Sequence, residues 1–268
     1  MTRAEGMTRG LENADRLASV EVPSLEGKVS DEEWKVRVDL AAAYRLIAHF
    51  GWDDLIFTHL SARVPGPEHH FLLNPYNLTF DEITASSLVK VDKDGMPVGE
   101  TPFATNPAGF TIHSALHMGV EDAHAVMHLH TAHGMAVSAQ EEGLLPLTQH
   151  AMLVLGEIAY HEYEGVAVDH DERERILADL GDKSMMIFRN HGTLSTGRTV
   201  GECFLKLFYL EKACQAQVMA QAAACSVPPQ GAPEVAAQQG MAGLQIIAAV
   251  NWQAMLRKAY RLDPSFAT

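Results

Sequence analysis

The sequence has no long uninterrupted run of apolar residues, although 47% of its 268 residues are hydrophobic. Charged or polar residues interrupt each apolar stretch before it reaches the roughly 20 residues that a membrane-spanning helix needs. The first 29 residues also lack the apolar segment of a secretory signal. We therefore expect a cytoplasmic protein that has no membrane partner and whose residues 1–29 form a flexible leader.

Positive charge is scarce, because 20 Lys and Arg residues stand against 34 Asp and Glu residues, for a formal net charge of −14. Nucleic acids and anionic membranes attract basic surfaces, so this balance argues against nucleic acid as a partner. A small anionic substrate stays compatible with it, since one bound cation can dominate a pocket. We expect a small-molecule substrate.

Cysteine is also scarce: the chain has only Cys203, Cys214 and Cys225, evenly spaced by eleven residues. Eleven residues are close to three helical turns, so the three side chains would lie along one stripe of a long helix. An odd number of cysteines at this spacing fits neither a disulfide framework nor a zinc–cysteine site. We interpret them as a buried packing stripe.

Hydrophobic patterning predicts helices and strands that are mixed along the whole chain. A capping box formed by Ser30 and Glu33 opens a helix that ends near Phe50. Strands are expected at residues 55–64, 70–73, 88–91, 123–130, 156–160, 185–189 and 193–196, and further helices at 110–118, 169–180, 199–224 and 234–260. This pattern predicts one three-layer α/β/α domain over residues 30–225, with a central mixed or antiparallel sheet. Residues 226–268 would form a helical extension that packs on the domain or on a neighbouring subunit.

Histidines at a particular spacing indicate a metal site. His128 and His130 lie two apart on an expected strand, so their imidazoles point to the same face. His191 is the best candidate for a third ligand, because Gly192 lets the chain turn sharply just after it. Three imidazoles with an open fourth position are typical of a catalytic site, with zinc as the first choice and manganese, cobalt, nickel or iron as alternatives. Chance is the competing explanation, since the chain has 14 histidines.

The segments around these histidines, His128–His133 and Arg189–Gly192, resemble the paired metal motifs of the class II aldolase/adducin family. Further segments resemble the head domain of adducins and their bacterial relatives: Thr58–Arg63, Phe80–Leu88, Asn106–His113 and Leu155–His161. The resemblance covers roughly residues 33–221 in the family's order.

This resemblance implies a three-layer domain in which His128, His130 and His191 hold the ion. In the sugar-phosphate aldolases of the family, the ion polarises a carbonyl and stabilises an enediolate during retro-aldol cleavage. It also implies a homo-oligomer, commonly a tetramer with active sites at subunit interfaces.

The sequence departs from these aldolases at Gly109, where they carry an acid/base glutamate. Retro-aldol cleavage needs a group that moves protons, so a sugar phosphate is not the expected substrate. His150, near the position of the family's catalytic tyrosine, and His113, one helical turn after Gly109, are the candidate catalytic replacements. Simple packing is the alternative for His113 and the interpretation that we favour for His117, while His161 is expected to be a solvated loop residue.

Bulky residues also stand where the aldolases bind phosphate, which favours an aromatic or carboxylated ligand. The expected substrate-binding residues are His59, Ser61, Tyr76, Asn77, Asn106 and Tyr163.

These observations leave several functions open. The first is a metal-dependent carbon–carbon lyase that works through a metal-stabilised enolate and cleaves a hydroxy-carbonyl compound. The second is a decarboxylase of an aromatic or keto carboxylate on the same site. The third is a non-catalytic, adducin-like scaffold, which we disfavour because the metal histidines are intact and the sequence ends at Thr268 without an adducin's long basic tail. A metal-buffering protein is a remote fourth.

Overall fold

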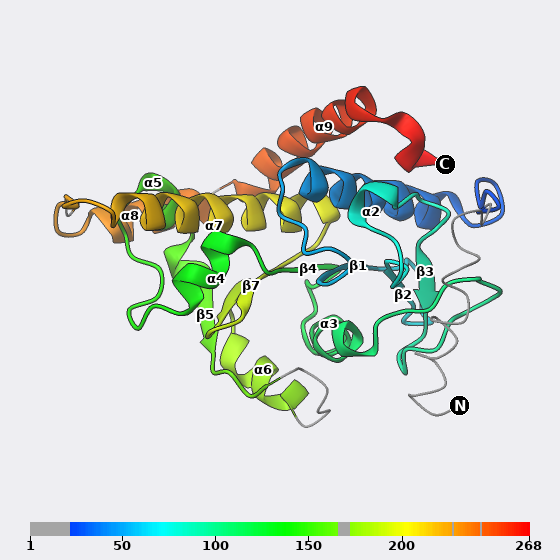
Figure 1. The fold of residues 1–268 in the computed structure, drawn as a ribbon, viewed down its shortest axis with the longest axis horizontal. Helices are drawn as coiled ribbons and strands as arrows, with labels where there is room; N and C mark the ends of the chain where they lie inside the picture. Colours follow the sequence, from blue (N-terminus) through cyan, green and yellow to red (C-terminus); the bar gives the residue numbers. More distant parts are fainter. Residues whose placement is uncertain (1–21, 166–171, 227, 242) are drawn as a thin grey trace.

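The computed structural model describes residues 22–165, 172–226, 228–241 and 243–268. Most of the expected leader, residues 1–21, therefore lies outside the described residues. The labels of helices and strands below are those of Figure 1.

A mixed sheet forms the centre of the molecule. Within the described residues it has seven strands in the order β3-β2-β1-β4-β7-β6-β5. The strands are β1 (His59–Arg63), β2 (Phe71–Leu73), β3 (Val89–Val91), β4 (Ala125–Leu129), β5 (Ile158–His161), β6 (Met185–Phe188) and β7 (Gly192–Gly197). Neighbouring strands are antiparallel except β5 and β6, which run parallel.

Helices cover both faces of this sheet, which confirms the three-layer α/β/α prediction. On one face lie α2 (Asp31–His49), α4 (Ala132–Ser138), α5 (Gln149–Val154), α7 (Val200–Ala220) and α9 (Leu244–Leu262). On the other lie α3 (Pro107–Gly119) and α6 (Glu172–Leu180) (Figure 1). Helix α8 (Ala232–Met241) packs on α5, and short 3-10 turns occupy Phe80–Glu82, Leu155–Glu157 and Pro264–Ala267.

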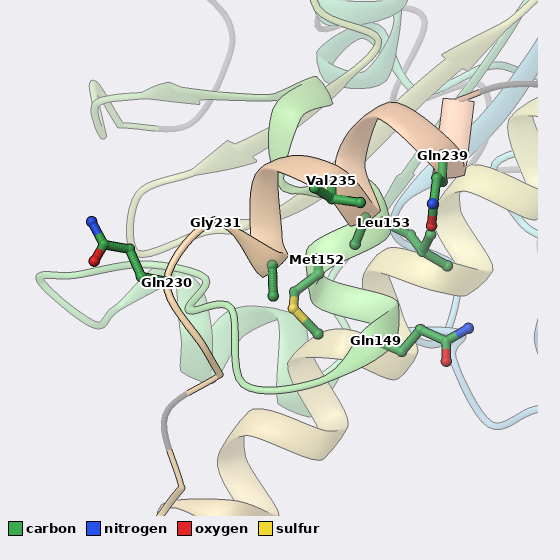
Figure 2. A pocket seen from close by; sticks show the side chains of 9 residues that line it. Gln149, Met152, Leu153, Gln230, Gly231, Val235 and Gln239 are labelled. Carbon is green, nitrogen blue, oxygen red and sulfur yellow. The ribbon is translucent and has the colours of Figure 1, made fainter.

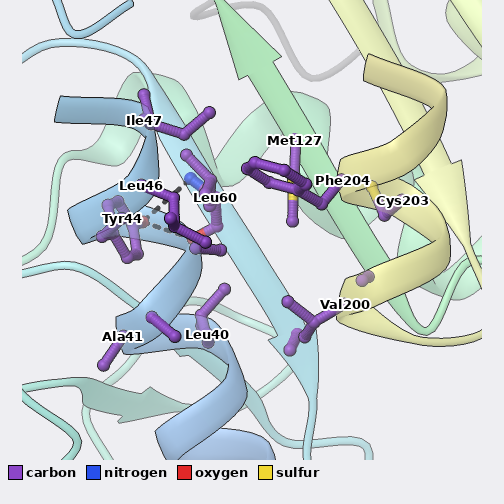
Figure 3. Close-up of a cluster of buried hydrophobic side chains, with 14 of the residues drawn as sticks. Leu40, Ala41, Tyr44, Leu46, Ile47, Leu60, Met127, Val200, Cys203 and Phe204 are labelled. Atoms are coloured by element: carbon purple, nitrogen blue, oxygen red, sulfur yellow. Dashed lines mark hydrogen bonds between the residues drawn. The ribbon is translucent and has the colours of Figure 1, made fainter. Parts of the chain in front are cut away.

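Alternation along the strands assigns each side chain to one of the two layers. Leu60 and Met127 pack with α2 and α7 in the larger core (Figure 3). Val126 faces α3 and α6 instead. His59 and His128 are direct partners in the β1–β4 register, so they share the face of α3 and α6. This register sets the layer in which the histidines gather.

In the first helix, Glu33 binds the capping residue through its backbone and other residues through its side chain. Ser30 caps α2 as predicted, because its Oγ accepts the backbone N–H of Glu33 at 3.1 Å. The return half of the predicted capping box does not form. The Glu33 carboxylate instead accepts hydrogen bonds from Arg37 at 2.8 Å and from Lys90 at 2.9 Å.

Several boundaries differ from the sequence prediction because of backbone conformation. The expected strand at 55–64 starts only at His59, since Leu55 (φ 54°) and Thr58 (φ 64°) have left-handed conformations that interrupt an extended strand. The expected helix at 234–260 is two helices, with Gly243 (φ 74°) between them. Helix α5, capped by the Thr148 hydroxyl, was not predicted.

The cysteine stripe is correct for two of its three members. Cys203 and Cys214 are buried on α7, whereas α7 ends at Ala220 and Cys225 is exposed beyond it. Within the described ranges, no helix combines the length and apolar character that crossing a bilayer requires.

The C-terminal helix α9 packs onto the domain. The Trp252 ring lies 5.6 Å from the Phe204 ring of α7 and is tilted against it, and its Nε1–H donates to Asp39 of α2 at 2.9 Å. The aromatic contact and the buried hydrogen bond fix α9 against the layer that contains α2 and α7.

Candidate metal centre

Three histidines from two separate segments meet at one end of the sheet. His128 and His130 come from the end of β4, and His191 comes from the turn between β6 and β7. One ring nitrogen of each lies within 4.8 Å of the others. The Nε2 atom of His130 is 3.0 Å from that of His128 and 2.8 Å from that of His191. The structure thus brings together the three residues that the sequence singled out.

The protons of two of these rings are assigned by their other hydrogen bonds. His128 Nδ1 lies 3.0 Å from the carbonyl oxygen of Thr193, which can only accept, so Nδ1 carries the proton. His130 Nδ1 lies 3.1 Å from the Asp54 carboxylate, which fixes the same tautomer. The two Nε2 lone pairs therefore face each other with no proton between them. A cation bound by both nitrogens is the arrangement that satisfies them, so the donor set fits a divalent metal.

The pKa values of the histidines agree with this role. Burial lowers the pKa of His128 well below its ordinary value and that of His191 to about 4. Repulsion from the neighbouring rings contributes to both shifts as the smaller cause. Both imidazoles are therefore neutral at neutral pH, as metal ligands must be.

The turn that carries His191 is shaped differently from the prediction. The left-handed residue is Asn190 (φ 55°), a residue type that tolerates this conformation better than most. Gly192 is needed for another reason: a Cβ there would overlap the carbonyl oxygen of Leu129 on the neighbouring strand. Ser138 of α4 anchors the turn by accepting the N–H of Asn190 at its carbonyl and that of His191 at its hydroxyl, both at 3.1 Å.

Two more histidines lie on the same face beside the triad. His59 pairs with His128 across the strands, and the His113 ring of α3 lies 6.0 Å from the His59 ring. Both side chains are buried, and burial lowers the pKa of His59 to about 4 and that of His113 well below its ordinary value. Among the described residues, neither Nε2 atom has a hydrogen-bond partner. Two buried nitrogens are thus available to a polar ligand group.

Behind this pair, His113, Ser61 and His117 form a hydrogen-bonded chain. His117 Nδ1 donates to the carbonyl oxygen of Ala123 at 2.7 Å, so its Nε2 is an acceptor. The Ser61 hydroxyl donates to that Nε2 at 2.7 Å and accepts the Nδ1–H of His113 at 2.6 Å. This order leaves a lone pair on His113 Nε2. The Ser61 hydroxyl gives its one proton to His117 and orients the His113 ring.

The remaining predicted substrate residues lie on loops and before the first turn of α3. Tyr163 is 56% exposed and its ring lies 6.3 Å from His191. Tyr76 and Asn77 are half-buried in the loop after β2, where Asn77 Nδ2 has no partner among the described residues. Asn106 directly precedes α3, and its carbonyl accepts the N–H of Phe110 in the first turn.

Gly109 and His150, the two positions compared with the catalytic residues of the aldolases, lie on different helices. Gly109 lies in the first turn of α3, which begins at Pro107 and therefore earlier than the expected start at residue 110. His150 lies on α5 and packs 5.2 Å from the Tyr209 ring of α7. Within the described part of the chain it makes no hydrogen bond, ion pair or ring contact with the triad. The structure of one chain therefore does not bring His150 to the candidate site.

One histidine was misjudged from the sequence, and two acidic residues were missed. His161 was expected in a solvated loop, but it is buried on β5, where its Nδ1 lies 2.6 Å from the Asp179 carboxylate. Asp54 orients His130, and Glu211 binds hydroxyls next to the triad. Asp54 is 76 residues from His130, and Glu211 is 80 and 18 residues from its two threonine partners. No local sequence signal could therefore have identified either residue.

The structure also contains a groove that the triad does not line. This groove, between α5 and α8, is lined by Gln149, Met152, Leu153, Gln230, Gly231, Ala232, Val235, Ala236 and Gln239 (Figure 2). None of these side chains is acidic, basic or a good metal ligand, so the groove lacks groups for acid/base or metal chemistry.

Comparison with known proteins places the chain in a family. The family model of the class II aldolase and adducin N-terminal domain matches residues 38–218. A Caulobacter vibrioides protein, named as a candidate class 2 aldolase, is 58% identical over 248 residues, which cover 91% of this chain and 96% of that protein. Rat alpha-adducin is 47% identical over 192 residues, 70% of this chain but only 26% of the adducin.

Solved structures agree. An aldolase II superfamily protein from Pseudomonas syringae is 49% identical with a TM-score of 0.88, over 92% of this chain and 100% of that one. L-fuculose 1-phosphate aldolase from Glaciozyma antarctica is 26% identical with a TM-score of 0.74, over 92% and 97%. The chain therefore belongs to the class II aldolase and adducin family.

Proposed function

We propose that the protein is a divalent-metal-dependent lyase that breaks a carbon–carbon bond of a hydroxy-carbonyl compound other than a sugar phosphate. His128, His130 and His191 would hold the ion, with zinc as the first choice and manganese, cobalt, nickel or iron as alternatives. The observation that carries the proposal is the 3.0 Å distance between the Nε2 atoms of His128 and His130. Two lone pairs at this distance favour a bound cation. When bound, the ion supplies Lewis-acid stabilisation of the negative charge that develops on the substrate oxygen.

His113 is the best placed group for the proton. Its Nε2 lone pair is buried beside the triad, while its Nδ1–H is held by Ser61. A proton taken up at Nε2 could leave through Nδ1 to Ser61 and from there to His117 Nε2, since the hydrogen bonds already run in that direction. The low pKa of the free His113 keeps this nitrogen unprotonated at neutral pH. An anionic substrate beside the ring would raise that pKa toward the useful range.

Several features support a substrate different from that of L-fuculose 1-phosphate aldolase, the relative of 26% identity. Gly109 offers no carboxylate in the first turn of α3. The buried His59 imidazole beside the triad suits a carboxylate or a hydroxyl. Tyr76, Asn77, Asn106 and Tyr163 would line the rest of the pocket, as predicted from the sequence.

Decarboxylation of an aromatic or keto carboxylate is the second candidate reaction. The observation that favours it is the same missing carboxylate, because the carbon dioxide that leaves takes no proton with it. The same triad would stabilise the same developing charge. The one proton that carbon takes up in place of the carboxylate would come from water and be passed on by His113.

The adducin-like scaffold is the alternative outside enzymology. It is supported by 47% identity to rat alpha-adducin. It gives no reason for the three histidine nitrogens to converge. A catalytic role for His150 and assembly into a tetramer also stay predictions. For that role, His150 would have to approach the triad of a neighbouring subunit.

The deciding experiment is the metal content of protein purified without a histidine tag or added metal. About one divalent ion per chain supports the lyase and justifies a screen of hydroxy-keto acids and aromatic carboxylates. Protein that carries no metal and gains no thermal stability from zinc, manganese, cobalt, nickel or iron would overturn the proposal in favour of the scaffold.

A further inference from the structure

We propose that Glu211 is a positioning residue that holds the three candidate metal ligands together from the opposite face of the sheet. This inference rests on the proposed metal site. It adds to that site a residue that touches neither the ion nor the substrate.

Glu211 is an acidic side chain with an unusual set of partners. It lies on α7 and is only 2% exposed. One carboxylate oxygen accepts a hydrogen bond from Thr131 Oγ1, and the other accepts one from Thr193 Oγ1 at 2.7 Å. In the described ranges no Lys, Arg or His forms an ion pair with it. By contrast Glu202, on the same helix and also buried, pairs with Lys206 at 2.8 Å.

The two hydroxyls connect Glu211 with every ligand. Thr131 directly follows His130 in the chain. Thr193 follows His191 by two residues, and its carbonyl oxygen is the one that receives the His128 Nδ1–H at 3.0 Å. One carboxylate therefore bridges the end of β4 to the start of β7, the two segments that must stay in register for three nitrogens to converge.

The surroundings leave little room for this bridge to relax. Thr131 Oγ1 also accepts the N–H of Gly134 at 3.0 Å, which caps α4. A Cβ on Gly134 would lie 2.8 Å from Thr131 Oγ1 and 3.0 Å from Glu211 Oε1, so the α4 backbone covers the carboxylate closely. A displaced Thr131 would displace its neighbour His130.

The protonation of Glu211 is linked to the proposed ion. Burial raises the pKa of this carboxyl, and the two threonine hydroxyls offset part of that rise. Burial thus disfavours the charged form of the side chain. A divalent ion in the triad would favour that charged form, and the charged form would in turn favour the ion.

The test measures binding of Co²⁺ alone, by competition with a chelator and by the visible absorption of the bound ion, which reports its ligand arrangement. Residues that orient metal ligands typically change affinity by about 10- to 100-fold. We expect Glu211→Ala to bind Co²⁺ about 10- to 100-fold more weakly, with an altered spectrum. Glu211→Gln can still bridge both hydroxyls, so it should rescue most of the spectrum and lie between wild type and Glu211→Ala in affinity. The matched control Glu202→Gln should bind Co²⁺ like the wild type.

Each other outcome overturns the inference in a distinct way. If wild type binds Co²⁺ and Glu211→Ala binds it within about twofold with the same spectrum, Glu211 does not position the ligands. If Glu202→Gln loses as much affinity, the effect is a general consequence of altering α7. If wild type itself binds no Co²⁺, the metal site fails and the role of Glu211 fails with it. Should Glu211→Ala not fold, the isosteric Thr193→Val removes one attachment and must weaken Co²⁺ binding, whereas Thr193→Ser must restore it.

Discussion

The His128 imidazole donates its Nδ1–H to the carbonyl oxygen of Thr193, 3.0 Å away on the neighbouring strand. This bond crosses the pairing of β4 and β7, where His128 is the partner of Leu194. It turns Nε2 toward His130 and His191 and determines which nitrogen carries the proton. The pairing of β4 with β7 thus orients the His128 nitrogen that faces the other two rings.

Removal of a proposed ligand should remove the metal. We expect His128→Ala and His191→Ala to fall from about one ion per chain to near none, because two imidazoles are too few for a stable site. Elemental analysis of tag-free protein measures this. His124→Ala, which changes an exposed histidine just before β4, should keep the full equivalent. A full equivalent of metal in either ligand variant would show that the assignment is wrong.

Gly192→Ala should lower metal affinity while every histidine stays in place. The added Cβ would meet the carbonyl oxygen of Leu129, so β7 must move away from β4 and take His191 with it. We expect at least about a tenfold loss in affinity by chelator competition, as for other changes that misplace ligands. Gly156→Ala is the matched control, because a Cβ there meets only the Ala237 Cβ at 3.5 Å. Equal affinities in the two variants would refute the steric explanation.

Exchange of the proposed base should separate turnover from metal binding. His113→Gln is expected to retain the ion and to lose about 10²- to 10⁴-fold in kcat, the usual share of a general acid/base group. The measurement is a kcat determination on whichever substrate the screen identifies, together with metal content on the same sample. Loss of the ion would instead make His113 a ligand, and unchanged kcat would leave it a packing residue.

The buried histidines should make the metal-free protein less stable in acid. Burial lowers the pKa of His117 to about 3, whereas in the unfolded chain it titrates near the ordinary value of about 6.5. Between these values the unfolded state binds more protons, so the free energy of unfolding falls as the pH falls through this window. From pH 7 to pH 5 this one group accounts for about 2 kcal/mol.

Urea unfolding of metal-free wild type at both pH values tests this, with His117→Gln beside it. The variant should lose about 2 kcal/mol less on going from pH 7 to pH 5, whatever its stability at pH 7. The control His49→Gln alters an exposed histidine at the end of α2 and should keep the wild-type dependence. An identical pH dependence in wild type and His117→Gln would contradict the prediction.

Two ion pairs of helix α2 should differ sharply in their contribution to stability. Arg37 is 2% exposed, pairs with Glu33 at 2.8 Å and donates to the carbonyl oxygens of Ala85 and Leu88. Arg37→Ala removes the hydrogen bonds that Arg37 donates to the buried Glu33 carboxylate and to these two carbonyl oxygens. The free energy of unfolding should therefore fall by about 3–5 kcal/mol. Lys35→Ala breaks a pair with Asp39 that has the same spacing, but the Lys35 side chain is 74% exposed and little should change. Denaturant unfolding compares the two, and equal losses would count against the burial argument.

The sequence by itself predicted the layers and the three candidate metal ligands that the structure brings together. Alternation and helical periodicity are local properties, so they predicted the order of elements, the three-layer architecture and the pairing of His128 with His130 on one face. The Ser30 cap could be recognised because its side chain binds the backbone N–H of Glu33, only three residues away.

Only the tertiary structure decided what surrounds those ligands. Asp54, Thr193 and Glu211 act on residues up to 80 positions away, and such contacts exist only after the strands have paired. The same reason explains why His161 was misjudged, since its burial depends on α6 covering β5. Composition and spacing describe what a residue can do, whereas its proton, its partner and its exposure are set by neighbours that the fold brings from elsewhere in the chain.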